Sequence, residues 1–321
     1  MSAYSSSLWR PDIAPDHEPH AVKMVRGSLT DSVRGNRIVP IKIYYPNFHP
    51  DASLPLVVWS HGLGGSTDGA AFLSRYIAGH GYVVLHVQHA GTDSALWEGK
   101  DGHPWDIIKA LTIPRSASLA RFGDVPFVLD AIPEWLAEHP EIPAIDFKTI
   151  GMSGHSFGAM TTQVLCGQQF PDEQGILQDY SDPRFKAGIL YSPVPAFHLT
   201  GELPDRIYGG IDRPLFHMTG TEDSSPVEGF DYTRRLAVYD YSHKAEKLLL
   251  ILKDGDHMIY NGSRGKLGAN PNRFKHENII KIAALAYWEA RLKGDKEAAQ
   301  WLTGGGFGTY LNGDGEFKYD Q

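Results

Sequence analysis

The chain has a single cysteine and a deficit of positive charge, and each scarcity excludes a class of protein. Among 321 residues, Cys166 has no second cysteine with which to form an internal disulfide. It lies in an apolar, helix-like stretch, which predicts a small buried side chain rather than a reactive thiol. Lysine and arginine number 30 against 38 acidic residues, for a net charge of −8. That balance argues against a surface for phosphates, so we expect no nucleic-acid partner.

Long apolar runs are also missing. No segment approaches the roughly 18 apolar residues of a membrane span, so none is predicted. Residues 1–11 lack the charged and then apolar pattern of a signal peptide. As written, the sequence predicts a cytoplasmic protein, or a secreted or periplasmic one if a leader has been removed. With 42% hydrophobic and 21% charged residues, we expect one soluble domain over residues 1–321.

Apolar runs rich in valine, isoleucine and leucine alternate with helix-like segments. This pattern predicts an α/β fold with a mainly parallel central sheet of about eight strands and helices on both faces. The expected strands cover residues 21–25, 38–45, 54–60, 82–87, 147–152, 185–191, 214–218 and 247–252. The expected helices cover residues 69–79, 117–136, 157–167 and 276–292.

Residues 90–116 form the one long segment without a clear period, and they contain Trp97 and Trp105. Long segments of this kind are often walls or lids of binding sites. Two interpretations remain open for the tryptophans, which either line a pocket or pack on the surface. The glycine-rich residues 303–308 are expected to form a loop.

The segment from Gly154 to Gly158, Gly-His-Ser-Phe-Gly, follows an apolar run and precedes a helix-like stretch. Glycines on both sides of a serine allow the sharp strand-to-helix turn that presents Ser156 as a nucleophile. The neighbouring His155 is expected to point away from the serine Oγ. The five-residue pattern alone is weak, and its weight depends on the partners that follow it.

An acid and a base follow the serine, each just after a predicted strand. Asp223 is the preferred acid, with the adjacent Glu222 as its rival, because Gly-x-x-Asp leaves a short turn after the strand. His257 follows the strong apolar run 248–252 and is the proposed base. His86 and His89 have a metal-like spacing, but no carboxylate or cysteine cluster completes a site, so neither a metal nor a cofactor is expected.

The run Ser-His-Gly-Leu-Gly-Gly at residues 60–65 follows another predicted strand. Its glycines allow backbone N–H groups to turn inward, where they could stabilise the oxyanion of acyl transfer. We assign the two donors to the N–H groups of Leu63 and Phe157. A plain strand-to-helix connection is the alternative. Met160, Met258, Trp97 and Trp105 are predicted to contact substrate.

Together these four motifs resemble the α/β-hydrolase superfamily over about residues 20–300. Within it, the His-Gly-Leu-Gly turn and Gly-His-Ser-Phe-Gly are similar to platelet-activating-factor acetylhydrolases and dienelactone-hydrolase-like esterases. The resemblance implies a Ser156–Asp223–His257 triad with oxyanion donors at Leu63 and Phe157. True dienelactone hydrolases use a cysteine nucleophile, so Ser156 makes a dienelactone a poor substrate.

The sequence therefore predicts a serine hydrolase that cleaves carboxylic esters through an acyl-enzyme. Apolar residues near the site favour neutral, partly apolar substrates of small-molecule or polymeric type, with short-acyl, aryl or polyester-like groups. Two alternatives remain. One is an amidase or peptidase with the same triad, and the other is a binding protein that keeps the fold without turnover.

Overall fold

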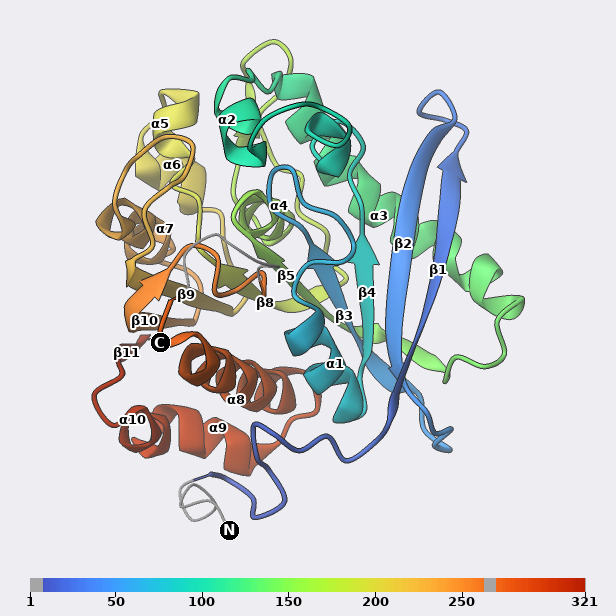
Figure 1. Ribbon diagram of the computed structural model, residues 1–321, viewed down its shortest axis with the longest axis vertical. Coiled ribbons are helices and arrows are strands. Elements are labelled where there is room, and N and C mark those ends of the chain that lie inside the picture. The colour runs from blue at the N-terminus through green and yellow to red at the C-terminus, as the bar shows by residue number, and fades with distance from the viewer. Residues whose placement is uncertain (1–7, 263–269, 321) are drawn as a thin grey trace.

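A computed structural model describes residues 8–262 and 270–320. In these ranges the chain forms a nine-stranded sheet in the order β1-β2-β4-β3-β5-β8-β9-β10-β11, with a separate β6-β7 pair (Figure 1). The strands are β1 (Val22–Asp31), β2 (Arg37–Pro46), β3 (Leu54–Ser60), β4 (Val83–Val87), β5 (Ile145–His155), β6 (Phe170–Pro171), β7 (Leu177–Gln178), β8 (Phe185–Tyr191), β9 (Leu215–Glu222), β10 (Lys247–Asp256) and β11 (Gly315–Asp320).

Helices connect and cover these strands. They are α1 (Ala71–Gly79), α2 (Pro104–Lys109), α3 (Arg115–Ala137), α4 (Phe157–Leu165), α5 (Phe197–Thr200), α6 (Pro204–Tyr208), α7 (Leu236–Tyr241), α8 (Arg273–Leu292), α9 (Lys296–Thr303) and α10 (Gly306–Leu311), with short 3-10 turns η1 (Ser94–Leu96) and η2 (Tyr232–Arg235). The mainly parallel sheet with helices on both faces confirms the predicted α/β-hydrolase fold class.

The six central strands from β4 to β10 run parallel, and the two edges are antiparallel. Their registers bring the carboxyl ends together. Ser60 at the end of β3 lies beside Gly154 of β5, and Glu222 at the end of β9 lies beside Asp256 of β10. The residues that follow these strands therefore leave the sheet together at the carboxyl ends of the strands, where ligands of open α/β sheets bind.

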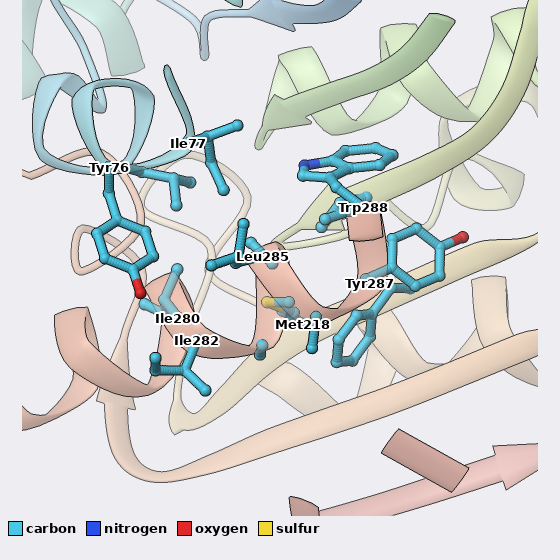
Figure 2. Close-up of a cluster of buried hydrophobic side chains, with 14 of the residues drawn as sticks. Tyr76, Ile77, Met218, Ile280, Ile282, Leu285, Tyr287 and Trp288 are labelled. Atoms are coloured by element: carbon cyan, nitrogen blue, oxygen red, sulfur yellow. The ribbon is translucent and has the colours of Figure 1, made fainter. Parts of the chain in front are cut away.

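One face of the sheet is covered by α1 and α8, with α9 and α10 beyond them (Figure 1). Helix α8 presents Ile280, Leu285 and Trp288 toward the sheet, and Tyr76 and Ile77 of α1 complete the same cluster (Figure 2). The apolar face predicted for residues 276–292 is thus core. Burial of such side chains contributes roughly 1.5–3 kcal/mol each.

The opposite face is covered by α3, α4, α6 and α7. Val125, Val128 and Ile132 of α3 pack on Leu56 and Val58 of β3. Side chains of one strand alternate between the faces, since Val57 and Trp59 of β3 belong to the cluster under α1 and α8. The buried strand is apolar on both faces, which is why its sequence is an uninterrupted apolar run.

Two sequence predictions of irregular structure are wrong. Residues 90–116 contain the short elements η1 and α2, and Arg115 already begins α3. In the glycine-rich stretch only Gly304 and Gly305 separate helices, because α10 starts at Gly306 and buries Phe307 in the core. Strand β11 was also not predicted, although its alternating half-buried and exposed residues are typical of an edge strand with one face on the core.

Candidate active site

Ser156 lies at the junction of β5 and α4 with φ 56° and ψ −116°. A non-glycine residue in such a conformation costs on the order of 1–3 kcal/mol, so surrounding contacts must hold it. Its N–H donates to the Tyr191 carbonyl of the neighbouring strand at 2.8 Å. A Cβ on Gly158 would collide with the Ser60 backbone, and one on Gly154 would collide with Gly158. The glycines therefore permit helix α4 to sit directly against β3.

Asp223 and His257 meet beside this turn. His257 Nδ1 lies 2.7 Å from Asp223 Oδ1, and Asp223 is fully buried. Thr219 donates its hydroxyl to the other carboxylate oxygen at 2.8 Å. Burial alone would raise the pKa of Asp223, but Arg235 and His257 outweigh it and lower that pKa below its ordinary value. Glu222, the rival acid, is exposed at the end of β9 and is not the partner of His257.

His155 supports His257 from the nucleophile turn. Its Nε2 lies 2.7 Å from the His257 carbonyl oxygen, and the two rings are in tilted contact with centroids 4.6 Å apart. Burial, together with the nearby His257, holds the pKa of His155 well below its usual range. The neutral imidazole therefore donates its Nε2–H to that carbonyl. The sequence predicts only that His155 points away from the Ser156 Oγ, and it does not predict the contact with His257.

The loop after β3 is shaped by His61. His61 Nε2 accepts the His89 N–H at 3.0 Å, so its Nδ1 carries the hydrogen and donates to the Gly62 carbonyl at 2.7 Å. That carbonyl also accepts the Gly65 N–H at 3.0 Å. In a trans peptide the following N–H points the opposite way, so the Leu63 N–H faces out of the turn.

The loop lies directly against Ser156. A Cβ on Gly62 would stand 3.4 Å from Ser156 Cβ. Within residues 8–262 and 270–320, the N–H groups of Leu63 and Phe157 have no hydrogen-bond partner. Phe157 is also the first residue of α4, where helix N–H groups are free and carry partial positive charge. The two predicted oxyanion donors thus lie close to Ser156, and no atom of the described residues accepts from their N–H groups.

A cavity of about 820 Å³ opens above these residues. Ser156, His257, Leu63 and Phe157 all line it. Its walls include all four residues predicted to contact substrate, namely Trp97, Trp105, Met160 and Met258. Trp97 Nε1 donates to the Gly64 carbonyl at 2.7 Å, which joins the segment 90–116 to the loop after β3. This segment is therefore a wall of the cavity.

Arg235 is a site residue that sequence patterns did not reveal. Its guanidinium is 2% exposed and lies 3.1 Å from Asp223 Oδ1, and its Nε donates to the Asp223 carbonyl at 2.9 Å. It lies in η2, and only the tertiary fold brings it to the acid. An arginine in a polar stretch of the sequence carries no local indication of that partner.

The spacing of His86 and His89 does not make a metal site. His86 Nε2 is 2.7 Å from the Ser74 hydroxyl, whereas His89 lies between Ser60 and Asp124. In the described part of the chain, no three histidine, cysteine or acidic side chains are grouped to hold a metal ion. Nor does any helix in those ranges have the length and apolarity needed to cross a membrane.

Comparison with known proteins supports the motif resemblance. Residues 17–99 match the family described as platelet-activating factor acetylhydrolase, isoform II. This range contains the loop after β3 but none of Ser156, Asp223 and His257. No curated protein matches the chain. With its mostly parallel sheet and this match, the protein is an α/β-hydrolase-fold chain similar to the platelet-activating factor acetylhydrolase, isoform II, family of lipase- or esterase-type hydrolases.

Proposed function

We propose that the protein is a serine esterase that hydrolyses carboxylic esters through an acyl-enzyme on Ser156. The observation that carries the proposal is the buried 2.7 Å contact between Asp223 Oδ1 and His257 Nδ1. The same His257 lines the cavity together with Ser156, which lies on a strained turn. An acid that fixes the imidazole tautomer beside an exposed hydroxyl is the arrangement that nucleophilic catalysis requires.

Asp223 accepts the Nδ1–H of His257, which leaves Nε2 free to accept a proton. As Ser156 Oγ attacks the ester carbonyl, His257 takes the hydroxyl proton and then passes it to the departing alcohol. Water, deprotonated by the same nitrogen, next attacks the acyl-enzyme. The acid leaves and Ser156 regains its proton, so the cycle consumes only ester and water.

The N–H groups of Leu63 and Phe157 support the same proposal. Each tetrahedral intermediate places negative charge on the former carbonyl oxygen. Both residues line the cavity with Ser156, and among the described residues neither N–H group has a hydrogen-bond acceptor. Loss of one such donor typically lowers the rate by about 10²–10³-fold. His61 and Arg121 hold the carbonyls of this loop, so the donors are aimed before substrate arrives.

Cavity composition favours neutral, partly apolar esters. Its walls carry Trp97, Trp105, Ile108 and Phe230 beside the reacting groups. Apolar walls with a few directed polar groups recognise ligands chiefly by shape and burial of apolar surface. We therefore propose short-acyl, aryl or polyester-like substrates, whether free or part of a polymer.

Hydrolysis of p-nitrophenyl esters of increasing acyl length tests the proposal. The variants Ser156→Ala and His257→Ala should lose activity by several orders of magnitude, and Asp223→Ala by about 10⁴-fold. Glu222→Ala is the matched control, because it removes the adjacent exposed carboxylate and should keep wild-type rates. A wild type that is inactive on every ester would sink the esterase proposal. A matched amide then separates an amidase from a non-catalytic binding protein.

A further inference from the structure

Arg121 of α3 is a fully buried guanidinium behind the loop after β3. Its Nη2 donates to the His61 carbonyl and, at 3.0 Å, to the Ser60 hydroxyl. Its Nε donates to the Thr161 hydroxyl of α4 at 2.8 Å. The guanidinium carbon also lies 4.5 Å from the centre of the Phe157 ring. One side chain thus contacts both segments that present the proposed oxyanion donors.

This guanidinium makes no ion pair with any carboxylate in residues 8–262 and 270–320. The nearby Asp124 binds Arg37 at 2.6 Å, Arg34 at 3.0 Å and His89 at 3.1 Å instead. Burial lowers the pKa of Arg121 to about 9, which leaves it charged at neutral pH. Only neutral oxygens accept its hydrogen bonds in the described residues. Burying a charge without an ion-pair partner costs free energy, so the presence of Arg121 here indicates a role other than stability.

A chain of hydrogen bonds orients its acceptors. Asp124 accepts His89 Nδ1–H, so His89 Nε2 accepts the Ser60 hydroxyl hydrogen at 2.9 Å. The Ser60 oxygen is then left to accept from Arg121. Ser60, His89 and Asp124 have the connectivity of a catalytic triad, but all three are fully buried and none lines the cavity. Their arrangement therefore serves the loop.

We infer that Arg121 is a positioning residue that fixes the spacing of the two oxyanion donors by binding the His61 carbonyl on one side and α4 on the other. The inference rests on the proposed esterase function. Its hydrogen bond to the His61 carbonyl sets the orientation of the peptide plane that precedes Gly62, and the next plane carries the Leu63 N–H. A misplacement of about 1 Å in such a donor is enough to lower the rate by about 10²-fold.

Kinetics of Arg121→Met, Arg121→Lys and Thr161→Val test the inference. Arg121→Met should lower kcat by about 30–100-fold with KM within about threefold, since the donors act mainly on the transition state. Arg121→Lys should recover part of that loss. Thr161→Val, which removes one anchor of the guanidinium, should lower kcat by about 3–10-fold. Thr162→Val is its matched control, because the hydroxyl of this neighbouring buried threonine donates within its own helix, to the Gly158 carbonyl at 3.0 Å.

A trifluoromethyl ketone, which forms an oxyanion on Ser156, supplies a second readout. Its affinity should fall in parallel with kcat across the series, a result that general loosening of the fold does not produce. A folded Arg121→Met enzyme with wild-type kcat overturns the inference. If that variant does not fold, equal rates for Thr161→Val and Thr162→Val overturn it. A wild type that hydrolyses no ester overturns the proposed function and this inference together, whereas an active wild type with unaffected variants overturns the inference alone.

Discussion

At the scale of single residues, the proposed site consists of a few reacting groups supported by buried charges. Ser156, Asp223 and His257 were accessible from sequence because each follows a strand in a short glycine-containing turn. Arg121 and Arg235 were not, since their partners His61 and Asp223 lie 60 and 12 residues away in the chain. Neither arginine has a spacing that distinguishes it from a solvated charge.

Asp124 gives a prediction at this scale. Burial would raise its pKa, but hydrogen bonds from Arg37 and His89 outweigh burial and lower the pKa to about 2. A lowered carboxyl pKa stabilises the fold above the unfolded value of about 3.9, and that stabilisation is lost as pH falls toward 2. Asp124→Asn should therefore lower the free energy of unfolding by about 3 kcal/mol at pH 7, and the deficit should shrink below about pH 4.

Urea denaturation at pH 7, 4 and 3 measures that difference. Asp130→Asn is the control on the same helix, because its carboxylate is 70% exposed and pairs with Arg184 at the surface. It should change stability by less than about 1 kcal/mol. A deficit in Asp124→Asn that stays constant down to pH 3 would contradict the assigned role of the charge.

At the scale of elements, the close approach of α4 to β3 determines the position of Ser156, the proposed nucleophile. Gly158→Ala should destabilise the protein by about 3 kcal/mol, because the added methyl group meets the Ser60 backbone rather than a flexible side chain. The kcat/KM of the protein that remains folded should also fall, because Ser156 and the loop after β3 would move apart. Thermal unfolding and kcat/KM of the folded fraction check both effects.

Gly308→Ala is the control for this change. Gly308 lies in α10 with open space around its Cα, so alanine should be neutral or stabilising by up to about 1 kcal/mol. Gly158→Ala with wild-type stability would show that α4 can move away from β3 without cost.

Most elements followed from apolar periodicity, and the exceptions have physical reasons. Helix α10 begins within a run of glycines, whose weak helix propensity is overridden by burial of Phe307 and Leu311 in the core. Helix α2 has Pro104 at its first position and His103 as its cap, inside a segment with no apolar period. The long helix α3 contains Pro126 and Pro133, yet it is continuous, with Val125, Val128 and Ile132 buried in the core on this face of the sheet.

At the scale of the whole molecule, residues near the beginning of the described chain pack against its last helices. The Trp9 ring contacts the Trp301 ring in a tilted arrangement with centroids 5.1 Å apart, and Arg10 binds Glu289 at 3.0 Å and Asp295 at 2.6 Å. None of these side chains lines the cavity. The packing of Trp9 and Arg10 therefore contributes to stability at a place separate from the proposed chemistry.

Two tryptophan substitutions should separate these properties. Trp9→Ala should lower the free energy of unfolding by about 3 kcal/mol and leave kcat/KM at 25 °C unchanged, because it empties a core position far from the reacting groups. Trp105→Ala should raise KM for apolar esters and alter the melting temperature little, since its half-buried ring forms a cavity wall. Chemical denaturation, thermal unfolding and ester kinetics on both variants measure these quantities, and a loss of activity in Trp9→Ala would contradict the separation.

The order of strands in the sheet has a consequence for the chain as it is synthesised. The segment that matches a known family ends at residue 99, before the nucleophile turn has been made. Ser156 can take its place once β5 pairs with β3, but its proposed base arrives only with β10, about a hundred residues later. A growing chain thus contains Ser156 well before the proposed base, and the proposed triad is complete only when β10, the last of the parallel strands, joins the sheet.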